Sequence, residues 1–177
     1  MQLGTLSFDL IDHDTVLVAP ATAASLQNIN SSQVYVTEID PTLSDTAAFC
    51  DHYGIGMDIS ANCVILEAKR GDRTWYAACM ILATDRADVN NIIRRQLDAR
   101  KISFAPMDTA TCLTGMEFGG ITPIGLPADW PILVDRKVAE AEHVIIGGGI
   151  RKSKLLVPGG LLAELPNATV LNLAKET

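Results

Sequence analysis

The sequence is short of the features that mark several classes of protein. Its longest apolar runs, such as residues 78–83, fall well below the roughly 20 residues that a membrane-spanning helix needs, so we expect no membrane association. No basic stretch followed by an apolar run stands at its start, which predicts no signal peptide and a cytoplasmic location. The cysteines show no C-x-x-C spacing and the histidines no H-x-x-x-H spacing. We therefore expect free thiols in or near the core, with no metal site, disulfide framework or cofactor. The residues concerned are Cys50, Cys63, Cys79, Cys112, His13, His52 and His143.

Positive charge is missing from the first 68 residues, which carry nine acidic residues and no Lys or Arg. The formal net charge of the chain is −7, so general DNA binding is not expected. Residues 69–177 nevertheless hold 14 basic and 12 acidic residues and can present a basic face. Each basic cluster is either a solvated surface or a contact to phosphate. The clusters are Arg94/Arg95, Arg100/Lys101, Arg136/Lys137 and Arg151/Lys152/Lys154.

The chain has 177 residues, 48% of them apolar, which is enough for one domain with one core. Short strand-like runs alternate with hairpins and short helices, without a regular βαβα repeat. This pattern predicts a mixed α/β (α+β-like) fold in which peripheral helices surround a mixed or barrel-like sheet, and it fits a doubly wound parallel sheet less well. Caps and stops predict helices from Ser44 to Gly54, from Asp88, from Asp108 to Gly115 and from Pro158. Strands are expected at residues 34–39, 63–66, 75–82, 102–105, 131–134, 144–146 and 155–157, the second and third forming a hairpin.

Two segments combine glycine with other turn-forming residues. The first, residues 118–127, reads F-G-G-I-T-P-I-G-L-P, in which glycine permits close backbone approach and proline fixes the chain. Such a segment either forms the wall of a ligand pocket or is a plain turn between a helix and a strand. The second, residues 147–154, reads G-G-G-I-R-K-S-K and lacks the Walker spacing, and a strand rather than a helix follows it. An ATPase is therefore disfavoured, and the segment is either an anion-binding nest or a strand connection.

The order of motifs from about Ser44 to Ala174 resembles the YbaK/EbsC family of aminoacyl-tRNA editing domains. Thr114-Gly115 followed by residues 119–125 is similar to the family signature T-G-x-x-x-G-G-I-S-P-x-G. Shorter matches in the same order support the resemblance: the first helix and glycine stop (46–54), the A-K-K-V-x-x-A strand (99–105), the I-D strand end (134–135) and the G-G-x-R loop (147–151). The resemblance implies an editing domain at about 44–174 and an N-terminal addition at about 1–40.

The resemblance implies a mixed α/β fold and hydrolysis of the ester that links a mischarged amino acid to the 3′ end of a tRNA. The family includes free-standing Cys-tRNA(Pro) deacylases and the insertion domain of bacterial prolyl-tRNA synthetases. The implied partners are the acceptor end of an aminoacyl-tRNA and, as a further candidate, a tRNA synthetase. The substrate-binding candidates are Gly119, Gly120, Ile121, Thr122, Pro123, Gly125, Asp135, Gly147, Gly148, Gly149 and Arg151. The candidate tRNA contacts, where phosphates dominate affinity, are Arg94, Arg95, Lys152 and Lys154.

One position departs from the family pattern. Members usually carry a functional lysine, as K-[ST]-L, at the start of the strand after the first helix, and here Asn62 or Cys63 stands in that place. Neither residue supplies a fixed positive charge, and the loss of such a contact costs about 2–4 kcal/mol of transition-state stabilisation. Cys63 is either a buried pocket residue or a nucleophile, and no histidine lies near it in the sequence to activate it.

Three functions remain open from the sequence. The first is a free-standing editing hydrolase that uses a positioned water and the backbone amides of residues 119–125. The second is a catalytically silent module that binds aminoacyl-tRNA or a nucleotide, as the missing lysine suggests. The third is a non-RNA hydrolase or scaffold on the same fold, as the acidic net charge suggests. Salt-insensitive binding of its partner would favour the third over the two RNA-linked functions.

Overall fold

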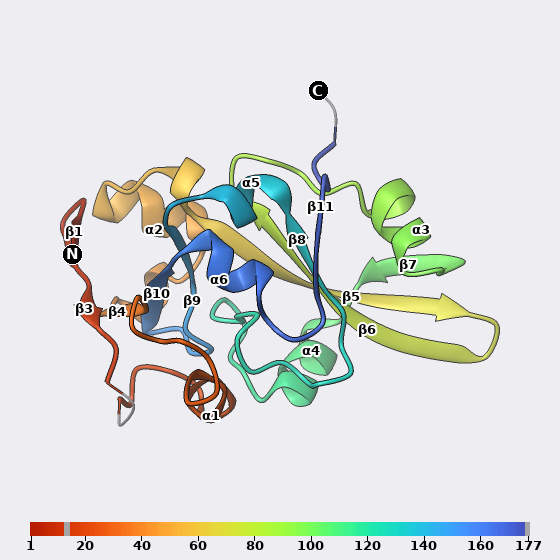
Figure 1. Ribbon diagram of the computed structural model, residues 1–177, viewed down its shortest axis with the longest axis horizontal. Coiled ribbons are helices and arrows are strands. Elements are labelled where there is room, and N and C mark those ends of the chain that lie inside the picture. The colour runs from red at the N-terminus through yellow and green to blue at the C-terminus, as the bar shows by residue number, and fades with distance from the viewer. Residues whose placement is uncertain (13–14, 176–177) are drawn as a thin grey trace.

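The computed structural model describes residues 1–12 and 15–175, so His13 lies outside the described part of the chain. Within these residues, six α-helices surround three sheets (Figure 1). The helices are α1 (Pro20–Leu26), α2 (Thr46–Tyr53), α3 (Arg94–Gln96), α4 (Met107–Thr114), α5 (Arg136–Glu140) and α6 (Gly159–Ala163). Short helical turns η1 (Pro41–Leu43) and η2 (Met57–Ile59) flank α2, and the π-helical turn η3 (Val89–Ile93) leads into α3.

A five-stranded mixed sheet, in the order β11-β8-β6-β5-β7, runs through the length of the molecule (Figure 1). Its strands are β5 (Ala61–Arg70), β6 (Arg73–Leu82), β7 (Lys101–Phe104), β8 (Ile132–Asp135) and β11 (Ala168–Leu171). The expected hairpin is confirmed: β5 and β6 pair antiparallel from Ala61↔Leu82 to Arg70↔Arg73, and Gly71 takes a φ of 60° in the two-residue turn. The tip of this hairpin projects at one end of the molecule, beside α3 and β7 (Figure 1).

A four-stranded antiparallel sheet lies at the opposite end, in the order β3-β4-β10-β9. It contains β3 (Asp9–Leu10), β4 (Tyr35–Glu38), β9 (Val144–Gly147) and β10 (Ser153–Val157), and β1 (Gln2–Leu3) pairs with β2 (Leu6–Ser7) beside it. Strand β10 is buried along its whole length because β4 and β9 pair with both of its edges, and its alternating side chains pack into two core clusters, Leu155 and Val157 in one and Leu156 in the other. Residues 1–40 therefore contribute the four strands β1 to β4 and α1 to the fold.

The mixed α/β fold expected from the sequence is confirmed, and its sheets stay open rather than closing into a barrel in the described part of the chain. Two expected caps are wrong. Asp45, not Ser44, caps α2 by accepting hydrogen bonds from the N–H groups of Ala47 and Ala48, because Ser44 already ends the turn η1. Helix α4 follows Pro106 without a side-chain cap, and Asp108 lies inside its first turn.

The core forms three clusters of buried side chains. The largest packs β5, β6 and β8 against β9, β10, α5 and α6, and a second packs Phe8 and Phe49 between the N-terminal strands and α2. All four cysteines are free thiols, but Cys112 is exposed on α4, so its expected place in or near the core is wrong. No helix within residues 1–12 and 15–175 is long and apolar enough to span a bilayer.

Candidate functional site

A pocket of about 290 Å³ opens where α2, the start of β5 and the two glycine-rich segments meet. It brings together both candidates for the missing family lysine, Asn62 and Cys63, with residues of both glycine segments, which the sequence places far apart. The lining residues are Thr42, Ser44, Asp45, Thr46, Ala61, Asn62, Cys63, Phe118, Gly119, Ile121, Gly147, Arg151 and Lys154.

The start of α2 forms one side of the pocket. The helix begins here because the Asp45 carboxylate accepts from two backbone N–H groups, at 3.1 and 3.2 Å. Thr46 Oγ1 in the first turn donates a hydrogen bond to Asn62 Oδ1 at 2.6 Å, which fixes the Asn62 side chain at the start of β5. Sequence reasoning missed the contribution of residues 44–46 to the pocket, although the S-D-T sequence is typical of a helix start.

The first glycine segment divides into two parts with different roles. Gly119 and Ile121 line the pocket, whereas Thr122, Pro123 and Gly125 lie outside its lining. Gly125 has a φ of 97°, and a Cβ at this position would lie 2.5 Å from the carbonyl oxygen of Ala21 in α1. The second part of the segment is therefore packed beneath α1, and only the first part can contact a ligand in this pocket.

The two glycine segments are packed backbone against backbone. Gly149 N–H donates to the Gly120 carbonyl at 2.7 Å. A Cβ on Gly120 would lie 2.4 Å from the Ile150 carbonyl oxygen, and one on Gly147 would lie 2.3 Å from the Gly120 carbonyl oxygen. Only glycine permits this approach, so these residues build the pocket wall, with Gly147 alone of residues 147–149 among those that line it.

Arg151 holds the edge of the pocket together. Its guanidinium donates to the Pro41 carbonyl from Nε (3.2 Å) and Nη2 (3.0 Å), and to the Phe118 carbonyl from Nη1 (3.3 Å). Its backbone N–H donates to Glu117 Oε2 at 2.6 Å. The five donors of a guanidinium are thus directed mainly at backbone carbonyls, which ties η1 to both glycine segments.

Lys154 enters the pocket from the buried strand β10. Its side chain is buried, with 6% of the residue exposed, and Nζ donates to the Ser44 carbonyl at 2.9 Å and lies 5.1 Å from the centre of the Phe49 ring. Burial lowers the pKa of its ammonium from the ordinary value of 10.5 to about 8. The nearby Cys50 and Asp45 raise this pKa, but by less than burial lowers it. The sequence marked Lys154 only as a candidate tRNA contact; the structure places it inside the pocket, apart from Arg94 and Arg95.

Cys63 is poorly suited to act as a nucleophile. Burial raises the pKa of its thiol far above its ordinary value, and the neighbouring Cys79 raises it further, so the thiolate is scarce at neutral pH. Neither His52 nor His143 lines the pocket. Within the described ranges, no group of three or more His, Cys, Asp or Glu side chains could hold a metal ion.

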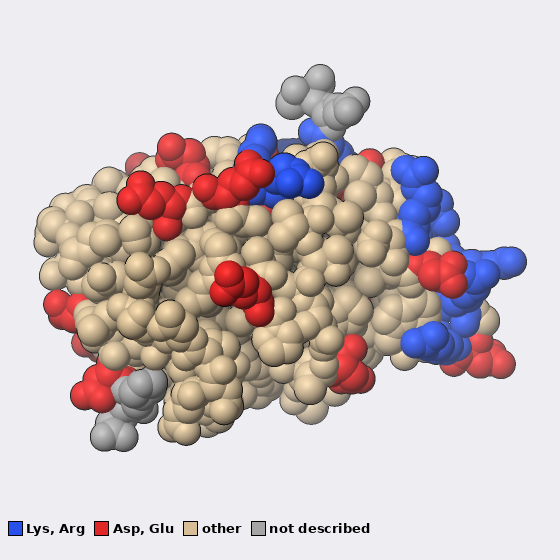
Figure 2. Space-filling model, in the orientation of Figure 1, with Lys and Arg blue, Asp and Glu red and all other residues tan. Residues whose placement is uncertain are grey.

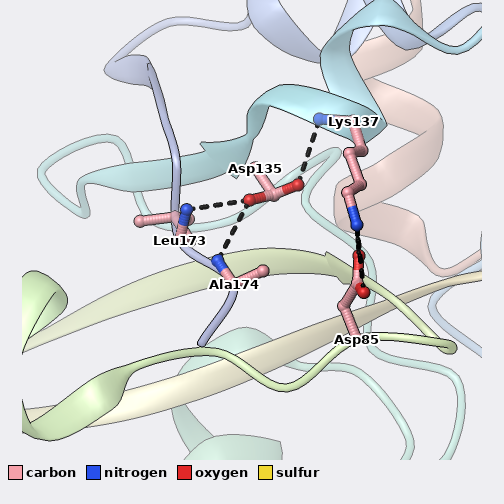
Figure 3. Close-up of polar contacts among 5 residues, drawn as sticks. All are labelled: Asp85, Asp135, Lys137, Leu173 and Ala174. Carbon is pink, nitrogen blue, oxygen red and sulfur yellow. Dashed lines mark hydrogen bonds and ion pairs between the residues drawn. The ribbon is translucent and has the colours of Figure 1, made fainter. Parts of the chain in front are cut away.

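Asp135 lies outside the pocket and holds the C-terminal segment against the sheet (Figure 3). Its buried carboxylate accepts hydrogen bonds from the N–H groups of Leu173 (2.8 Å) and Ala174 (3.3 Å), and from that of Lys137 (3.0 Å) at the start of α5. The Lys137 ammonium, in turn, pairs with Asp85 at 2.9 Å. The family-like I-D strand end is therefore a structural joint in this fold rather than part of the pocket.

Basic side chains gather at the end of the molecule that carries the β5–β6 tip, α3 and β7 (Figure 2). Arg94, Lys69, Arg100 and Lys101 line a groove of about 430 Å³, and Arg95 lines a neighbouring hollow of about 840 Å³. Lys152 lies instead in the loop before β10, next in sequence to Arg151, which lines the pocket of about 290 Å³. We define the basic end by seven residues, half of the Lys and Arg residues of the chain. They are Lys69, Arg70, Arg73, Arg94, Arg95, Arg100 and Lys101.

Comparison with known proteins finds a family whose model matches this chain and solved structures that share its fold. The model of the aminoacyl-tRNA editing domain matches residues 40–165. A solved structure described as a candidate trans-editing enzyme for prolyl-tRNA synthetase is similar at a TM-score of 0.74 and 17% identity, over 90% of this chain and 99% of that one. A hypothetical protein is similar at 0.75 and 20% identity, over 88% and 99%. A candidate signal-transduction protein from Marinobacter aquaeolei VT8 matches at 0.58 and 19% identity, over 88% of this chain and 30% of that one. At these identities the structural likeness shows the fold alone.

Proposed function

The chain belongs to the aminoacyl-tRNA editing domain family, and from this premise we propose that it is a free-standing deacylase that hydrolyses the ester of a mischarged tRNA. The observation that carries the proposal is the pocket at the junction of β5, α2 and both glycine segments, which Gly119 and Ile121 help to line. Its volume of about 290 Å³ suits an aminoacyl group rather than a whole nucleotide.

The basic end supports the proposal that the substrate is a tRNA, because it can bind the phosphates of the acceptor stem. Asn62 in the pocket and Lys69 in the basic end lie seven residues apart on β5, which corresponds to about 23 Å along the strand. This length exceeds the reach of a single nucleotide, so an RNA whose end lies in the pocket can also contact the basic end through several phosphates. We propose that the aminoacyl end enters the pocket while Arg94, Arg95 and their neighbours contact phosphates of the acceptor stem.

Deacylation of a panel of mischarged tRNAs tests the proposed activity directly. We expect turnover above the buffer rate on at least one member, and the absence of turnover on all of them would refute a deacylase. The R94Q/R95Q variant should raise KM and weaken the salt dependence of binding while leaving kcat nearly unchanged, because phosphate contacts position the RNA without taking part in the chemistry. The R136Q variant is the matched control, since it removes a positive charge on α5 outside the basic end.

A catalytically silent binding module is the second candidate, and it is favoured by the uncharged Asn62 and Cys63 at the start of β5. Calorimetry with a non-hydrolysable aminoacyl-adenosine would then show binding in the absence of turnover on every mischarged tRNA. In that case N62K, which adds a lysine where Thr46 now holds the amide, should create deacylase activity. Turnover by the unmodified protein would exclude the silent module.

A further inference from the structure

Lys154 is unusual among the charged residues of this fold. Lysine is almost never fully buried unless it is paired, yet 94% of this residue is shielded from solvent. In the described part of the chain no carboxylate lies within ion-pair distance of its ammonium, whose hydrogen bond goes to the neutral carbonyl of Ser44. A buried positive charge without a carboxylate partner destabilises the folded chain, so a role in function rather than in folding accounts for it.

The position of the ammonium indicates that role. Lys154 and Arg151 are the two basic residues that line the pocket, and the Arg151 guanidinium is directed at the carbonyls of Pro41 and Phe118. An ammonium has three N–H donors, and the Ser44 carbonyl takes up one of those of Lys154. Three of the five Arg151 donors are thus directed at backbone carbonyls, whereas Lys154 keeps two of its three donors for a ligand in this pocket.

We propose that Lys154 is a catalytic residue that binds the carbonyl oxygen of the scissile ester as that oxygen becomes negatively charged. This inference rests on the proposed deacylase function and names the group that would carry its electrostatic part. The small volume of the pocket favours the ester over a backbone phosphate, because it admits the aminoacyl group while the nucleotides stay outside. A charged donor directed at a developing oxyanion acts more strongly where it is shielded from water, as the buried Lys154 is.

The reaction balances with water as the other reactant. A water oxygen bonds to the ester carbonyl carbon, and the electron pair of the C=O bond moves to the oxygen that faces Lys154 Nζ. The bond from that carbon to the ribose oxygen then breaks, and the ribose oxygen takes up a proton lost by the attacking water. The products are a tRNA with a free terminal hydroxyl and an amino acid whose carboxyl group releases a proton.

Binding of two adenosine analogues tests the role of Lys154 separately from turnover. One is an alanyl phosphonate, whose tetrahedral anion resembles the transition state, and the other is a neutral alanyl amide. We expect the protein to bind the phosphonate at least tenfold more tightly than the amide by calorimetry, and K154M to lose this preference. K137M, which removes a lysine on α5 away from the pocket, should keep it.

Kinetics on the mischarged tRNA that is turned over fastest provide the second readout. K154M should lower kcat/KM about 100-fold or more, in line with the loss of one oxyanion donor. After subtraction of the buffer rate, kcat/KM of the unmodified protein should fall above pH 8, where the ammonium loses its proton, whereas K154R should remain active to pH 10. A K154M variant that keeps both the phosphonate preference and its kcat/KM overturns the proposal. If the unmodified protein deacylates no tRNA and binds neither analogue, the proposed function itself fails.

Discussion

Replacing Lys154 with methionine should make the protein more stable while it removes activity. Methionine matches the length of the lysine stem and can fill the same space between β10 and the Phe49 ring without carrying a charge. The folded chain now holds that charge in a buried strand, where its pKa falls from 10.5 to about 8. The difference of about 2.5 pKa units corresponds to roughly 3 kcal/mol of destabilisation at neutral pH.

Part of that gain is lost again in the variant. The Ser44 carbonyl would lose its hydrogen-bond donor, which costs about 1 kcal/mol, so a net stabilisation of about 2 kcal/mol remains at pH 7. The effect depends on pH in a definite direction. Because the unfolded chain binds more protons than the folded one between pH 8 and pH 10.5, the stability of the unmodified protein rises across this window. The advantage of K154M should therefore nearly vanish by pH 10.

Urea unfolding of both proteins at pH 7 and pH 10, followed by circular dichroism, measures this difference. The K137M variant is the matched control, because its lysine is on the surface and pairs with Asp85, so its removal should bring no gain in stability. A K154M protein that is less stable than the unmodified one at pH 7 would refute the reasoning. So would a stability difference of the same size at both pH values, since the cost of the buried charge would then be absent.

Three further predictions concern the pocket wall, the thiols and the C-terminal joint. G120A should lower the free energy of unfolding by about 1–3 kcal/mol, because its Cβ would lie against the Ile150 backbone, whereas G160A, with open space around it, should be neutral or slightly stabilising in thermal melts. Iodoacetamide at pH 8 should label the exposed Cys112 before Cys63, whose thiol pKa is raised, and early labelling of Cys63 in peptide mass spectra would contradict this order. D135N should cost about 1–3 kcal/mol and speed hydrogen exchange at residues 173–174, and unchanged exchange there would argue against the joint.

Local chemistry explains what the sequence could predict. Gly54 and Gly115 end their helices with φ values of 66° and 65°. Glycine commonly ends a helix in this left-handed conformation, so both helix ends are predictable from the sequence. The hairpin follows from two apolar runs and a turn that needs a positive φ at Gly71. The sequence predicts the cap of α2 one residue too early because Ser44 and Asp45 are both good caps. The choice between them depends on η1, which the sequence does not mark.

Contacts between segments that lie far apart in the chain explain which features of the site the sequence could not predict. Ser44 and Lys154 are 110 residues apart, so no spacing rule indicates that one binds the other. A lysine inside the K-S-K run of residues 152–154 is expected on a solvated surface, but the fold makes β10 an inner strand and packs this side chain beside the Phe49 ring. Likewise, residues 119–125 form one motif in the sequence, but Gly120 packs against Ile150 and Gly125 against α1, and only Gly119 and Ile121 line the pocket.

The separation of charge along the molecule also affects how it meets an RNA. Residues 69–101 carry eight basic and four acidic residues, whereas the rest of the chain carries six basic and seventeen acidic ones. Such a distribution makes the molecule an electric dipole whose positive side is the basic end, where Lys and Arg side chains gather (Figure 2). In the field of a polyanion a dipole rotates before contact, so we expect encounters with the hairpin tip foremost and repulsion of approaches by the opposite end, which carries the four-stranded sheet. An acidic protein can in this way associate rapidly with RNA in one orientation.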